Sequence, residues 1–133
     1  MKHLFTFLLI VSSVACFAQG NLQFNKVLNF DYPSVFVSAS GTVLLETINV
    51  PIGKVWKITA ASSFKANSTS NSAYKSSLAV NSHFLWYNQG NEAAMNTPFW
   101  LSSGVHEFKV INEYSAGLTF SSAISVIEFN IVP

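Results

Sequence analysis

The sequence contains no arginine and few charged residues of any kind. Of its 133 residues, 10% are Asp, Glu, Lys or Arg, and the formal net charge is +1 at pH 7. Nucleic-acid binding requires a dense positive surface and favours the arginine fork for phosphate and guanine. The composition therefore excludes a nucleic-acid partner. Because lysines and carboxylates are nearly balanced, the sequence also shows no obvious positive surface for binding anionic membranes.

Cysteine is almost absent as well, and the one cysteine, Cys16, lies near the N-terminus. It follows an apolar run over residues 4–14, and Ala18 completes the small-residue pattern of a signal-peptide cleavage site. We expect residues 1–18 to be a signal peptide and residues 19–133 to be a single domain without disulfides. Because a membrane span needs about 20 apolar residues, the run is too short to cross a bilayer. The predicted location is secreted or cell-surface, with no transmembrane segment in the mature chain.

A lipoprotein is the less favoured alternative. Residues 13–16 loosely resemble a lipobox, the signal for attaching lipid to a cysteine. Serine at the first position of that segment matches the pattern poorly, so cleavage after Ala18 is the preferred prediction.

Helical periodicity is absent after the leader, and two-residue alternation takes its place. The clearest case is residues 42–65, two extended runs joined by a tight turn at residues 51–54, which we interpret as a hairpin. In the second run we expect Trp56 to lie in the core on the same face as four residues, namely Ile58, Ala60, Ser62 and Phe64.

Similar short runs, punctuated by glycine, serine and asparagine, fill the rest of the chain. They are expected over residues 22–30, 35–37, 78–80, 84–87, 98–101, 106–112, 118–120 and 124–132. The pattern predicts an all-β fold, an antiparallel β-sandwich that is jelly-roll-like and has about eight strands. Five apolar residues would then face outward and indicate self-association, namely Val27, Val43, Leu45, Ile111 and Val126.

Catalytic and metal-binding patterns are weak. After the leader, the two histidines, His83 and His106, lie in no catalytic motif, and structural roles explain them better. We therefore predict no enzyme activity, no catalytic residues, no cofactor and no transition-metal site. A calcium site formed by loop carbonyls and amides is an alternative that the sequence leaves open.

A group of aromatic and amide residues gives the best indication of a ligand site. Sugar recognition pairs a flat aromatic ring with nearby hydrogen-bonding groups, and such residues gather around the segment 86–92. The predicted ligand-binding residues are Trp86, Tyr87, Asn88, Gln89, Asn91 and Trp100. The alternative is that these rings belong to the core or its rim, as most aromatic residues of a small sandwich do.

Three segments, VPIGKVWKI (50–58), PFWLSSG (98–104) and SVIEFNI (125–131), resemble segments of small secreted bacterial β-sandwich proteins of unassigned function. Comparable segments occur in tail-fibre-like β modules. The resemblance implies fold and export, and it carries no activity. We therefore predict a secreted non-enzymatic binding module that recognises glycans or cell-surface material. The alternative is a structural subunit of an extracellular homo-oligomeric assembly.

Overall fold

The computed structural model describes residues 21–66, 74–89 and 93–132. These residues form strands joined by turns, and no helix lies among them. The strands are β1 (Asn21–Val37), β2 (Thr42–Val50), β3 (Lys54–Lys65), β4 (Lys75–Val80), β5 (His83–Gln89), β6 (Ala93–Met95), β7 (Phe99–Leu101), β8 (Gly104–Asn112) and β9 (Leu118–Val132). The predicted signal peptide lies outside the described residues.

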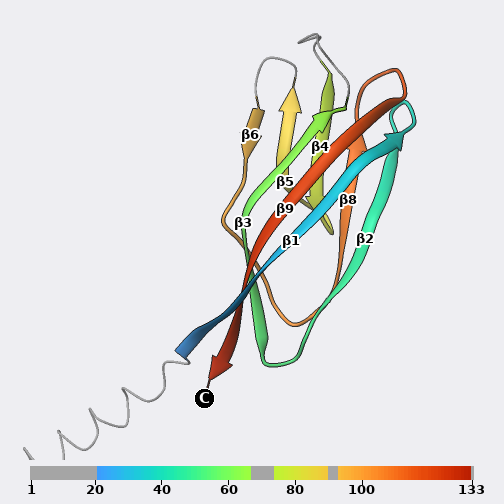
Figure 1. Ribbon diagram of the computed structural model, residues 1–133. Helices are drawn as coiled ribbons and strands as arrows, with labels where there is room; N and C mark the ends of the chain where they lie inside the picture. Colours follow the sequence, from blue (N-terminus) through green and yellow to red (C-terminus); the bar gives the residue numbers. More distant parts are fainter. Residues whose placement is uncertain (1–20, 67–73, 90–92, 133) are drawn as a thin grey trace, which may run out of the picture.

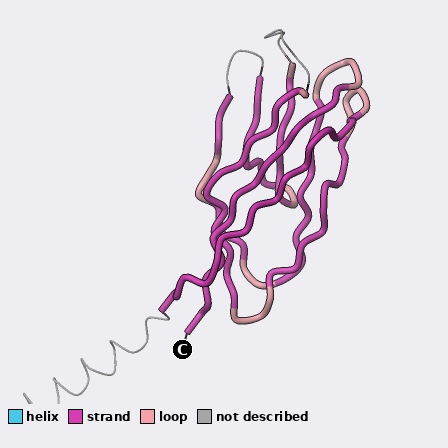
Figure 2. The backbone as a smooth tube through the Cα atoms, in the orientation of Figure 1, coloured by secondary structure: helices cyan, strands magenta, loops and turns pink. Residues whose placement is uncertain are grey.

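Two antiparallel sheets pack face to face (Figure 1), and Figure 2 shows the same path as a tube with strand along most of its length. Sheet A has the order β1-β9-β3-β7, and sheet B has the order β2-β8-β4-β5-β6. The pairs β1–β9, β2–β8, β3–β7 and β4–β5 alternate between the sheets, as in a long hairpin rolled into a jelly roll. The predicted jelly-roll-like sandwich is confirmed, with the three-residue β6 as an added edge strand.

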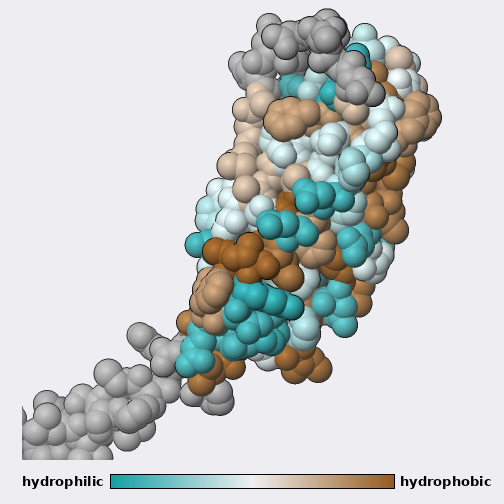
Figure 3. Space-filling model, in the orientation of Figure 1, coloured by the Kyte–Doolittle hydropathy of each residue, from teal (hydrophilic) through white to brown (hydrophobic). Residues whose placement is uncertain are grey.

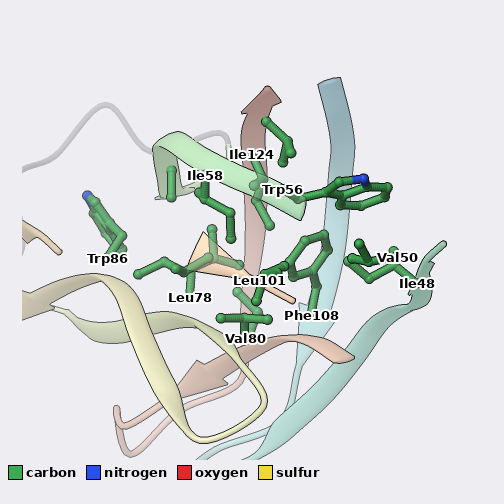
Figure 4. Packing of buried hydrophobic residues seen from close by; sticks show 14 of the residues in the cluster. Ile48, Val50, Trp56, Ile58, Leu78, Val80, Trp86, Leu101, Phe108 and Ile124 are labelled. Carbon is green, nitrogen blue, oxygen red and sulfur yellow. The ribbon is translucent and has the colours of Figure 1, made fainter. Parts of the chain in front are cut away.

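The core lies between the sheets and is built around Trp56 and Phe108, which are 6% and 0% exposed. Phe30 packs against both, with ring centroids 5.9 Å from Trp56 and 5.4 Å from Phe108. Figure 4 shows the aliphatic residues that fill the space around these rings. The prediction that Trp56 is a core residue is confirmed.

The predicted turn at residues 51–54 is present, but the hairpin is wrong. The Lys54 N–H donates to the Pro51 carbonyl at 3.1 Å, and Gly53 takes a φ of 77° that its missing Cβ allows. The strands on either side, β2 and β3, belong to different sheets. The turn is therefore an arch between layers, and the turn between β7 and β8 crosses between the sheets in the same way.

The predicted faces of β3 hold only up to a β-bulge. Trp56 and Ile58 point into the core as expected, and the register then shifts between Ile58 and Ala60. One extra residue exchanges the two faces of a strand. Ala61 is therefore buried in place of Ala60, and Phe64 is exposed.

The faces of β9 are also reversed. Val126, predicted to face outward, is fully buried between the sheets. Phe129 and Ile131 instead lie on the outer face of sheet A, because they alternate with the buried Glu128. Val27 is exposed as predicted, whereas the other members of that set are half-buried, namely Val43, Leu45 and Ile111.

Candidate functional site

A bulge in the β4–β5 pair decides where the predicted ligand residues point. Leu78 pairs with Trp86 and Ala79 with Phe84, so that Leu85 is left over, and both Leu85 and Trp86 are buried. The alternation beyond Trp86 places Asn88 inside and the neighbouring side chains Tyr87 and Gln89 outside, as their half-buried and exposed states show. The four predicted residues of β5 are thus divided between the two faces of sheet B.

Trp86 is part of the core, with 5% of its surface exposed. Phe64 of sheet A packs edge-to-face against it at 5.7 Å, and Figure 4 shows Trp86 and Trp56 at opposite sides of the packed cluster. The ring of Trp86 is therefore closed to a ligand in this structure. Asn88 is buried too, and its Oδ1 has no partner among the described residues. Asn91 lies outside them.

Tyr87 and Gln89 line an open hollow of about 220 Å³ on the outer face of sheet B. Three further residues complete its lining, namely Ser77, Phe84 and Glu113. The hollow therefore combines two aromatic rings with two hydroxyls, one amide and one carboxylate. We use "the hollow" for the site formed by these five residues.

Strand pairing and a short turn bring the lining of the hollow together. Ser77 of β4 pairs with Tyr87 of β5, and its small side chain lies almost fully buried at the floor. Ser77 Oγ donates to Glu113 Oε1 at 3.3 Å, and the Glu113 N–H donates to the Lys75 carbonyl at 3.0 Å. Sequence reasoning missed Ser77, Phe84 and Glu113, because the contact between the turn after β8 and β4 depends on tertiary pairing.

Asn112 fixes the turn that carries Glu113. Its side chain is fully buried, and Nδ2 donates to the carbonyls of Ser38 and Ala116 at 2.9 and 2.8 Å. Its Oδ1 accepts from the Tyr114 N–H at 3.0 Å. Because one amide joins the end of β1 to both sides of the β8–β9 turn, Glu113 is held in a defined position beside the hollow.

Trp100 lies on the outer face of sheet A, whereas the hollow lies on sheet B. It is 45% exposed, and its ring centroid lies 5.7 Å from that of Phe129. The Lys57 ammonium lies 5.3 Å from the Trp100 ring centroid, within the range of a cation–π contact. The predicted site therefore does not form as a unit, because Trp86, Tyr87 and Trp100 occupy three different environments.

The described chain also contains one buried carboxylate, Glu128. It accepts hydrogen bonds from Trp56 Nε1 at 2.8 Å and from the Asn25 amide, and Lys54 Nζ lies 3.5 Å away. Burial alone would raise the pKa of Glu128, but these hydrogen bonds and the charges of Lys26 and Lys54 hold that pKa below its usual value.

Both histidines have structural contacts. His106 Nε2 is 2.9 Å from the Ser102 carbonyl, its Nδ1 is 3.1 Å from Asn81 Nδ2, and the His83 ring packs 5.1 Å from the ring of Phe99. Neither lines the hollow. Among residues 21–66, 74–89 and 93–132, no three His, Cys, Asp or Glu side chains gather as metal ligands, and no helix is long and apolar enough to cross a membrane.

Comparisons with family models, with curated proteins and with solved structures found no match for this chain. The resemblance to small secreted β-sandwich proteins therefore stays a prediction.

Proposed function

We propose that this domain is a secreted, non-enzymatic binding module that recognises glycans or related cell-surface material through the hollow. The observation that carries the proposal is the lining of the hollow. Two rings, Phe84 and Tyr87, share one open depression with the polar side chains of Ser77, Gln89 and Glu113.

This combination suits a sugar. The C–H face of a pyranose is apolar and packs on an aromatic ring, while its hydroxyls need hydrogen-bonding partners. Gln89 offers donors and an acceptor, and Glu113 offers carboxylate oxygens. Ser77 already holds Glu113 from one side, so the carboxylate is oriented before a ligand arrives.

A binding role accords better with the hollow than hydrolysis does. Glycoside hydrolysis generally uses two carboxyl groups on either side of the scissile bond. Among the described residues, Glu113 is the one carboxylate that lines the hollow. The described lining therefore offers contacts to a sugar and a single carboxyl group.

The test is a glycan array probed with the purified protein, followed by titration of the strongest ligand. Tyr87→Ala removes the ring that packs on the sugar, and we expect the affinity to fall at least about tenfold, which is about 1.4 kcal/mol. Trp100→Ala is the matched control, since it removes an exposed aromatic ring from the other sheet. Loss of binding in Trp100→Ala but not in Tyr87→Ala would place the ligand on sheet A and contradict the proposal.

The alternative function, a structural subunit of a homo-oligomeric assembly, makes a different prediction. A stable oligomer by light scattering together with a blank array would favour the structural role. A monomer whose array signal depends on Tyr87 would favour recognition.

A further inference from the structure

One end of the sandwich is formed by the two arches, the start of β1 and the end of β9. We call it the terminal end, and it comprises residues 21–27, 50–57, 100–105 and 129–132. Leu22 pairs with Ile131, and the Ile131 N–H donates to the Gly53 carbonyl at 2.9 Å. Val50 pairs with Gly104, which brings the two arches side by side. Four segments that are distant in the sequence therefore meet at this end of the sandwich.

Large apolar side chains are exposed on this surface. Ile52, at the tip of the first arch, is 95% exposed, and Val105, beside the second arch, is 67% exposed. The others lie on the strands at this end, namely Leu22, Phe24, Val27, Trp100 and Ile131. Figure 3 shows hydrophobic and hydrophilic residues next to each other there. Leu22 pairs with Ile131, and Phe24 pairs with Phe129, whose ring contacts Trp100. Exposed apolar residues that occur singly need no explanation, but a contiguous group such as this one on sheet A marks a contact surface.

The surface charges of the described residues at the terminal end are positive. Its four segments contain Lys26, Lys54 and Lys57 and no aspartate or glutamate. One carboxylate lies at this end as well, because Glu128 is 3% exposed and pairs with Lys54 at 3.5 Å. Lys26 and Lys57 have no ion-pair partner among the described residues. The surface is therefore both apolar and cationic, a property that the overall balance of charges in the sequence does not reveal.

We propose that the terminal end docks onto the surface of an anionic lipid bilayer. Ile52 and Val105 would enter the boundary between headgroups and acyl chains, and the lysines would remain among the anionic headgroups. Lysine side chains suit this depth because their stems are apolar and their ammonium groups stay in water. The half-exposed indole of Trp100 is suited to the same interface.

Charge favours this partner over a second copy of the chain. A two-fold interface places the same patch on both sides. Two terminal ends in contact would bring the lysines of both copies together, and the Glu128 carboxylate at this end is buried and already paired with Lys54. An anionic bilayer neutralises the lysines and covers the apolar tips at once.

The experiment is co-sedimentation of the purified protein with vesicles. One set contains equal amounts of phosphatidylglycerol and phosphatidylcholine, and the other contains phosphatidylcholine alone. We expect binding to the anionic vesicles that weakens as salt is added, and little binding to the neutral ones. Absence of binding to the anionic vesicles, or equal binding to both sets, would overturn the proposal.

Two pairs of variants localise the contact. Ile52→Ser should weaken binding to the anionic vesicles about tenfold, because the apolar tip is lost. The matched control is Leu44→Ser, which alters a residue that is 50% exposed elsewhere, on β2, and should leave binding unchanged. Lys26→Gln should weaken binding a few-fold, whereas Lys75→Gln, in β4 near the opposite end, should not.

The outcomes separate the proposal from self-association. If Ile52→Ser abolishes a concentration-dependent dimer and vesicles bind neither protein, the surface contacts a second copy and the proposal is wrong. Circular dichroism of Ile52→Ser should match the parent protein, since almost the whole residue faces solvent. The proposal does not depend on sugar binding at the hollow, so the failure of one leaves the other intact.

Discussion

The two ends of the sandwich are held by buried polar side chains of different kinds. At the terminal end, the Glu128 carboxylate lies beneath Trp56 and is satisfied by Trp56, Asn25 and Lys54. At the opposite end, the neutral Asn112 amide joins the end of β1 to the turn after β8. The first arrangement depends on charge, and the second depends on hydrogen bonds alone.

The difference has a functional counterpart. Asn112 positions the turn that carries Glu113, and so it supports the proposed sugar site in the hollow. Glu128 holds Trp56 and Lys54 beneath the terminal end, where the proposed lipid contact lies. A change of pH should therefore alter the stability that Glu128 contributes, whereas the contribution of the Asn112 amide should not change.

The largest expected effect comes from removing the ring that covers Glu128. Trp56→Ala should lower the free energy of unfolding by about 3–5 kcal/mol, because it leaves a cavity beside Phe30 and removes a hydrogen bond to a buried carboxylate. Chemical denaturation measures this value. Trp56→Phe is the control that keeps an aromatic ring in the core. It should retain a large part of the stability that Trp56→Ala loses. A loss below about 1 kcal/mol for Trp56→Ala would show that the terminal end does not depend on this contact.

Asn112→Ala should have an intermediate effect at the opposite end. The substitution leaves the Ser38 and Ala116 carbonyls and the Tyr114 N–H without their partner, which costs about 2–3 kcal/mol. The loss should be the same at pH 7 and pH 4, since an amide does not titrate in this range. Hydrogen exchange should increase in the β8–β9 turn more than in β3. A loss that varies with pH would contradict the inference that the uncharged Asn112 amide stabilises this end.

The sequence predicts the class of fold well but not the faces of individual strands. Alternation and turn residues are local signals, so they indicate a jelly-roll-like sandwich and place Trp56 in its core. Bulges depend on the partner strand, and each one exchanges inside for outside. The bulge at Ala60 exposes Phe64, and the one beside Leu85 buries Trp86.

For the same reason, only part of the candidate site could be predicted. Tyr87 and Gln89 are close in the sequence, and both line the hollow. Glu113 reaches the hollow through the contact between the turn after β8 and β4, and no short sequence pattern encodes that contact. The terminal end could not be predicted from the sequence either, because its lysines and apolar residues come from four separated segments.

The smallest expected effect at neutral pH, and the most specific, is that of Glu128→Gln. The amide keeps one acceptor for Trp56 Nε1 but turns a donor toward the Asn25 amide and the Lys54 ammonium. We expect a loss of about 1–2 kcal/mol in the free energy of unfolding at pH 7, measured by chemical denaturation.

This loss should shrink on acidification. The pKa of Glu128 in the folded state lies below its ordinary value of 4.5, so ionised Glu128 stabilises the fold above that pH. As the pH falls below 4.5 and through the folded-state pKa, the carboxylate is protonated and the contribution is lost. The parent protein should then approach the Gln variant, while its difference from Asn112→Ala stays constant. A gap between the parent protein and Glu128→Gln that is unchanged at pH 3 would mean that the charge on Glu128 does not stabilise the terminal end.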